Sequence, residues 1–177
     1  MHESDYPETQ PGEQEESCVD HFPDECVEEK ETKTGQGSIK VESMTAMVSR
    51  LAVSDKIKLA LIGNKEARGL LIKESNKVVV KNVLENPRVT DDEAIMYAGN
   101  RNLSSEVPRI LANKRHFLKI FKVRCALVKN PKTPVPQALK LLPGLPEHVL
   151  KEISRSTGVA GVVKSTAKRF LAQRVRS

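Results

Sequence analysis

The chain has 177 residues, a formal net charge of +6, 38% apolar residues, 3% aromatic residues and three cysteines. This length predicts one folded domain, and the scarcity of aromatic residues disfavours a β-sandwich, whose sheets rely on aromatic and β-branched cross-strand pairs. An odd number of cysteines excludes a fully paired disulfide framework. No apolar run approaches the roughly 18 residues of a membrane span, so we expect a cytoplasmic protein that does not enter a membrane.

Charge divides the chain into two parts. Residues 1–42 contain 13 acidic residues and 3 lysines, whereas residues 43–177 contain 26 basic and 10 acidic residues. The first part is rich in Pro, Gln, Thr and Ser, so it has too little apolar surface to offset the entropy lost on ordering. The sequence therefore predicts a disordered acidic tail over 1–42, a linker or lead-in helix over 43–53, and a helical domain over 54–177.

Within the predicted tail, Cys18, His21 and Cys26 lie close together. A zinc site usually needs four ligands in paired short spacings; nearby carboxylates could complete a set, but no second cysteine pair follows. The other histidines and glycines form neither a metalloprotease motif nor a phosphate-binding loop. We therefore predict no metal, no cofactor and no catalytic residues.

The helical domain begins with short blocks that are separated by Asn, Gly and Pro. Thr90 and Glu93 have the spacing of a capping box, and Asn86-Pro87 and Asn130-Pro131 each end a block. The pattern predicts about eight or nine helices of roughly 8 to 15 residues. Helices this short are not stable alone in water, so we expect an all-α fold in which each helix packs on its neighbours.

The blocks also resemble each other. At an offset of 44 residues, Val79 aligns with Val123, Val83 with Leu127, and the first Asn-Pro pair with the second. Self-similarity with a period of about 20 to 50 residues is typical of solenoids, because one short helix pair cannot bury its apolar face and a stack of pairs can.

Residues 123–134, VRCALVKNPKTP, resemble the leucine-rich repeat variant motif, in which a helix ends at Asn-Pro and a Thr-Pro opens the next helix. The resemblance covers residues 56–172 and implies a short right-handed helical solenoid related to HEAT-like arrays. It also implies a protein-binding scaffold that holds its partner on the concave surface. The spacing between units is irregular, and fold alone does not establish function.

Positive charge is the strongest functional feature of the sequence. From residue 94 onward there are 17 basic and 3 acidic residues. Arg115, Lys119 and Lys122 have spacings of 4 and 3, which would place them on one face of a helix. A basic stripe attracts polyanions, although charge also keeps a surface soluble. The candidate anion-binding residues are Lys114, Arg115, Lys119, Lys122, Lys129, Lys132, Lys164, Lys168 and Arg169.

Two functions follow from these features. The first is a non-enzymatic scaffold that binds an acidic protein partner; the alternative is a sequence-nonspecific binder of nucleic acid or another polyanion. Phe117, Phe121 and Phe170 are predicted to lie in the core, which leaves no stacking platform for bases. The opposite charges of the two parts of the chain also suggest that the acidic tail folds back on the basic body.

Overall fold

The computed structural model describes residue 22, residues 24–28 and residues 37–175, and these contain helices and loops but no strand. The all-α fold class is therefore confirmed. In chain order the helices are α1 Asp24–Val27, α2 Gly37–Arg50, α3 Val53–Ile62, α4 Lys65–Leu71, α5 Lys77–Glu85, α6 Asp91–Gly99, α7 Glu106–Leu111, α8 Arg115–Lys119, α9 Phe121–Lys129, α10 Val135–Leu141, the 3-10 helix η1 Leu142–Gly144, α11 Glu147–Arg155 and α12 Gly161–Val175. None of them is long and apolar enough to cross a membrane.

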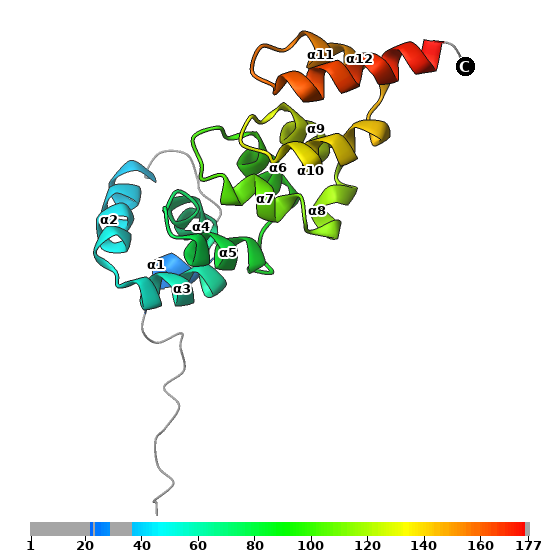
Figure 1. Ribbon diagram of the computed structural model, residues 1–177. Helices are drawn as coiled ribbons and strands as arrows, with labels where there is room; N and C mark the ends of the chain where they lie inside the picture. Colours follow the sequence, from blue (N-terminus) through cyan, green and yellow to red (C-terminus); the bar gives the residue numbers. More distant parts are fainter. Residues whose placement is uncertain (1–21, 23, 29–36, 176–177) are drawn as a thin grey trace, which may run out of the picture.

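The helices follow one another along an elongated body, with α1 to α3 at one end and α11 and α12 at the other (Figure 1). Neighbouring layers pack through α3 against α5, α6 against α9, and α11 against α12. Buried side chains form one cluster that extends from Phe22 to Leu127 and a second that extends from Val128 to Ala167. The two clusters meet within α9, so this helix belongs to both.

The predicted boundary at residue 42 is wrong for the residues that the structure describes. Phe22 and Cys26 are buried, and α1 packs against α3 and α4. Helix α2 crosses the boundary, which agrees with a lead-in helix but starts it at Gly37. The prediction used the average composition of 42 mainly polar residues, in which a few apolar residues such as Phe22 and Cys26 have little weight. The rest of residues 1–42, with Cys18 and His21, lies outside the described residues.

The two Asn-Pro pairs form equivalent structures. Asn86 is 3% exposed, and its Nδ2 donates to the Ala60 carbonyl at 3.0 Å, while its Oδ1 accepts from the Arg88 amide at 2.8 Å. Asn130 is 4% exposed and does the same: Nδ2 donates to the Ala98 carbonyl at 2.8 Å and Oδ1 accepts from the Lys132 amide at 3.0 Å. Each asparagine thus joins its own turn to the end of an earlier helix.

These asparagines replace hydrogen bonds that the helix ends have lost. The amide four residues after Ala60 belongs to Asn64, and it donates to the Cys26 carbonyl at 2.7 Å. The amide four residues after Ala98 belongs to Asn102, and it donates to the Asn100 side chain at 2.9 Å. Since the last carbonyls of a helix need partners from outside it, a buried asparagine amide is suited to both positions.

A buried ionic network joins α4 to α6. Arg68 and Glu93 are each 1% exposed, and their side chains form two hydrogen bonds of 3.0 and 2.8 Å. Tyr97 and Thr90 also donate to the Glu93 carboxylate, at 3.1 Å each, and Thr90 with Glu93 forms the predicted capping box. Burial alone would raise the pKa of Glu93, but Arg68, the Thr90 amide and Tyr97 together hold it below its ordinary value.

Candidate functional site

Two of the predicted anion-binding lysines hold backbone carbonyls of the protein itself. The Nζ of Lys114 donates to the Leu84 carbonyl in the last turn of α5 at 2.9 Å, and burial lowers the pKa of this lysine. The Nζ of Lys132 donates to the Leu103 carbonyl at 2.6 Å. The Lys114 ammonium therefore satisfies a carbonyl in the last turn of a helix, and the Lys132 ammonium satisfies one in the loop between α6 and α7.

The prediction that Arg115, Lys119 and Lys122 share one helix is wrong. The backbone at Ile120 is extended, with φ −75° and ψ 113°, so it ends α8 and begins α9. Arg115 and Lys119 lie exposed on α8, whereas Lys122 lies exposed on α9. Ile120 packs against the core cluster, which favours a break at a position that has no glycine or proline.

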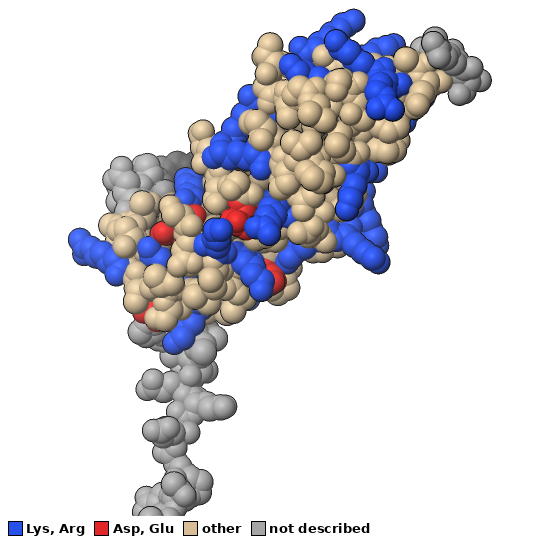
Figure 2. Space-filling model, viewed as in Figure 1, with Lys and Arg blue, Asp and Glu red and all other residues tan. Residues whose placement is uncertain are grey.

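The other predicted residues lie on α9 and α12. Lys129 forms an ion pair of 2.7 Å with Glu152 of α11, Lys164 is half-buried, and Lys168 and Arg169 are exposed. On the face shown in Figure 2, Lys and Arg side chains lie along both edges of the C-terminal half with uncharged residues between them, and the visible Asp and Glu side chains lie over the N-terminal half. On this face the basic residues therefore do not join into one stripe.

A groove of about 560 Å³ brings two of the predicted lysines, Lys122 and Lys129, together with residues that the sequence did not assign to a binding site. Its lining comes from α6 and the loop after it, from α9 and from α11. The lining residues are Ile95, Gly99, Arg101, Phe121, Lys122, Cys125, Ala126, Lys129, Asn130, His148, Val149 and Glu152. We call this set the α6–α9–α11 groove.

The groove combines an apolar interior with unpaired positive charge. Ile95, Ala126 and Val149 contribute the aliphatic surface of the groove, which we call its floor. Lys129 is neutralised by Glu152, but Arg101 and Lys122 have no carboxylate partner among the described residues. A ligand that fits this pattern presents apolar side chains to the floor and carboxylates to the rim.

Phe121 is another departure from the sequence prediction. Phe117 is buried as expected, and Phe170 is half-buried against the second core cluster. Phe121, however, is 40% exposed in the groove, with the Arg124 guanidinium 5.8 Å from its ring centroid. An exposed aromatic ring beside arginine is common at binding surfaces, so Phe121 supplies the largest apolar contact that a ligand can make here.

Arg101 lines the groove from the loop after α6, and its guanidinium lies close to Gly158. A Cβ atom at Gly158 would lie 2.8 Å from one terminal guanidinium nitrogen of Arg101 and 2.9 Å from the other. The guanidinium therefore lies against the loop between α11 and α12. Sequence spacing contains no indication of this contact, since the two residues are far apart in the chain.

Cys125 also lines the groove but has no sign of nucleophilic activation. Burial raises the pKa of its thiol, an effect that outweighs the nearby positive charge of Lys129 and Arg124, and a raised pKa keeps the group protonated near neutral pH. In the described part of the chain, no group of three or more His, Cys, Asp or Glu side chains is arranged to hold a metal ion.

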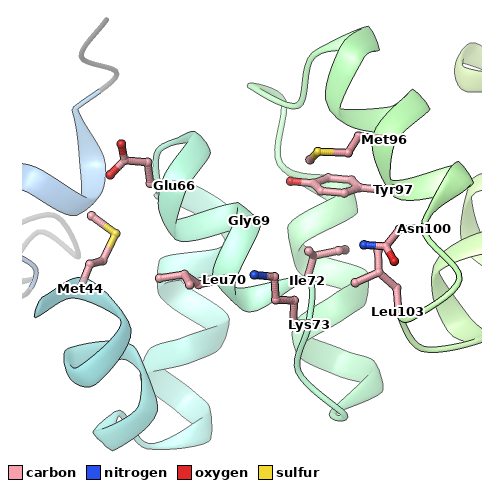
Figure 3. A pocket seen from close by; sticks show the side chains of 10 residues that line it. All are labelled: Met44, Glu66, Gly69, Leu70, Ile72, Lys73, Met96, Tyr97, Asn100 and Leu103. Atoms are coloured by element: carbon pink, nitrogen blue, oxygen red, sulfur yellow. The ribbon is translucent and has the colours of Figure 1, made fainter. Parts of the chain in front are cut away.

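A second cavity of about 310 Å³ lies between α2, α4 and α6. Figure 3 shows Met44 approaching from α2 and Met96 and Tyr97 from α6, on opposite sides of Leu70. Glu66 and Lys73 are its charged residues. Because their charges are opposite, they do not select a ligand of one sign, and this cavity is the weaker candidate.

Comparison with family models, with curated proteins and with solved structures found no match to this chain.

Proposed function

We propose that the protein is a non-enzymatic binding module, a short right-handed helical solenoid of the leucine-rich repeat variant type, which holds an acidic, amphipathic segment of a protein partner in the α6–α9–α11 groove. The observation that carries the proposal is the pairing of an apolar floor with two cations, Arg101 and Lys122, that have no carboxylate partner among the described residues. The repeated Asn-Pro hydrogen bonds support the solenoid.

The lining chemistry favours a peptide over a nucleic acid. A single-stranded nucleic acid needs several stacking surfaces and a track of phosphate contacts, and the exposed rings in the groove are those of Phe121 and His148. Its aliphatic floor instead fits the apolar face of a helix or an extended segment.

The test measures fluorescence anisotropy of a labelled designed peptide with Leu at helical spacing on one face and Glu on the other. The groove variant is Arg101→Ala with Lys122→Ala. The matched control is Arg115→Ala with Lys119→Ala, which also removes two exposed cations but from α8, outside the groove. We expect the groove variant to bind about ten-fold more weakly, at roughly 0.7 kcal/mol per lost charge contact, and the control to bind as the native chain does.

A labelled single-stranded oligonucleotide, titrated across a salt series, tests the alternative. Two results together would replace the peptide proposal with a polyanion binder. The oligonucleotide would bind with micromolar affinity near physiological salt, with a salt dependence that indicates several phosphate contacts, and the groove variant and the α8 control would lose equal oligonucleotide affinity. A peptide affinity that neither pair of substitutions changes would also reject the groove.

A further inference from the structure

We propose that residues 1–21 of this chain occupy the α6–α9–α11 groove in cis and compete there with an external acidic segment. This inference rests on the proposed function, because it assigns an intramolecular ligand and therefore a mode of regulation to the same groove.

The groove sets the chemistry of its occupant. Arg101 and Lys122 need carboxylates, the half-exposed Phe121 ring needs an apolar contact, and Lys129 is already paired with Glu152. A suitable occupant is therefore strongly acidic, carries almost no lysine or arginine, and contains a few apolar side chains.

Of the segments outside the described residues, one fits this description. Residues 1–21 contain seven acidic residues and no lysine or arginine, and they include Tyr6 and Val19 as apolar groups. Residues 29–36 contain two acidic residues and two lysines, so they have no net charge, and residues 176–177 include an arginine. Charge complementarity therefore selects residues 1–21.

The point of attachment allows the contact. Residues 1–21 join the body at Phe22, which is buried in the same core cluster as Val123 and Leu127 of α9. A segment of this length reaches about 70 Å when extended. Helix α1 packs on α4, and α4 contacts α6 through Arg68 and Glu93, so the path from α1 to the groove is about two helix spacings of roughly 10 Å each. The groove is thus within reach without any change in the helices.

A tethered segment can compete with an external ligand even when its own affinity for the groove is weak. If the tether gives the segment an effective concentration of about 1 mM and the segment binds the groove with a dissociation constant of about 100 μM, an external competitor binds about ten-fold more weakly. Salt would reduce the contact, because exposed charge pairs are screened within about 8 to 10 Å at physiological ionic strength.

The experiment keeps the full chain and neutralises the segment by Glu→Gln and Asp→Asn substitutions at Glu3, Asp5, Glu8, Glu13, Glu15, Glu16 and Asp20. The probe is the labelled Leu/Glu peptide described above. We expect the neutralised chain to bind it about ten-fold more tightly than the native chain at low salt, with the difference shrinking as salt rises.

Removing seven negative charges also raises attraction for any anion, so the same neutralisation is made in the Arg101→Ala, Lys122→Ala background. In that background the increase in probe affinity should disappear, because the segment no longer has its binding site. An increase of equal size would come from general electrostatic attraction and would overturn the inference. A gain that grows with protein concentration would mean that the segment occupies a second copy of the chain, which also overturns binding in cis.

The outcomes separate the two proposals. Equal probe affinity in the native and neutralised chains, together with a loss on Arg101→Ala and Lys122→Ala, leaves the proposed function standing and overturns the inference. Absence of probe binding to both chains rejects the groove as a site for acidic peptides, and the inference with it.

Discussion

Replacing Asn86 with alanine removes a buried side chain that connects three backbone groups. Its Nδ2 donates to the carbonyls of Ala60 and Gly63 at 3.0 and 3.4 Å, and its Oδ1 accepts from the Arg88 amide at 2.8 Å. The Ala60 carbonyl depends on this contact, because the amide that would serve it within the helix donates to Cys26. Gly63 keeps a second donor, Arg68, at 3.0 Å.

Two good hydrogen bonds are therefore lost and one buried carbonyl is left without its partner. At about 1 kcal/mol for each net hydrogen bond, and with a further cost for the unsatisfied carbonyl, we expect Asn86→Ala to lower the free energy of unfolding by about 3 kcal/mol. For a domain of this size that corresponds to a melting temperature roughly 6 to 12 °C lower, measured by far-ultraviolet circular dichroism.

Asn86→Asp tests which hydrogen bond matters. Aspartate keeps the acceptor for the Arg88 amide but replaces the donor with a second oxygen that faces the Ala60 carbonyl. We expect it to destabilise the protein at least as much as alanine does, since a buried charge has been added without a partner. A melting temperature close to the native value for Asn86→Asp would refute this reasoning, and Asn102→Ala, at an exposed residue, is the control.

Three further predictions follow from the buried and groove contacts. Glu93→Gln should lower the free energy of unfolding by about 3 to 5 kcal/mol in urea titrations, because it removes the carboxylate charge that receives two buried hydrogen bonds from Arg68. In the native chain, the stabilisation from the Glu93 carboxylate is present above pH 4.5, the ordinary pKa of the group, and is lost as pH falls through the lower pKa of the folded state. The free energy of unfolding of the variant should therefore depend less on pH in the acid range. Lys114→Met should lower stability by about 1 kcal/mol and leave peptide affinity unchanged, because that lysine holds a carbonyl and lies outside the groove. Gly158→Ala should displace the Arg101 guanidinium and weaken peptide binding about three-fold, an effect of roughly 0.7 kcal/mol, with little change in melting temperature.

The parts of the fold that sequence predicted were those set by local chemistry. The Thr90–Glu93 capping box forms as expected, because its partners are three residues apart and this spacing of Thr and Glu is typical of that motif at a helix start. Asn86-Pro87 and Asn130-Pro131 end α5 and α9 as predicted, since proline disfavours helix at the residue before it. The number of helices was underestimated because one break, at Ile120, has no glycine or proline to mark it.

The contacts that sequence did not predict join residues far apart in the chain. Lys114 reaches a carbonyl 30 residues away and Lys132 one 29 residues away, so two candidate anion ligands have structural roles. The Arg101 guanidinium, which lines the groove, lies against Gly158 in the loop between α11 and α12. Counting charge along the chain measures the total attraction for anions, but the packing of α6, α9 and α11 decides which cations remain free.

The two buried asparagines separate the stability of the fold from the integrity of the groove. Asn86 and Asn130 make equivalent hydrogen bonds, so alanine at either position should cost a similar free energy of unfolding. Only Asn130 lines the groove, and its bond to the Ala98 carbonyl at 2.8 Å holds the end of α6 from which Arg101 projects. Asn130→Ala should therefore weaken binding of the Leu/Glu peptide at temperatures well below its unfolding transition, while Asn86→Ala should not. If both variants lose stability but neither loses affinity, the position of Arg101 does not depend on this hydrogen bond, and the lining residues of α6 contribute little to recognition.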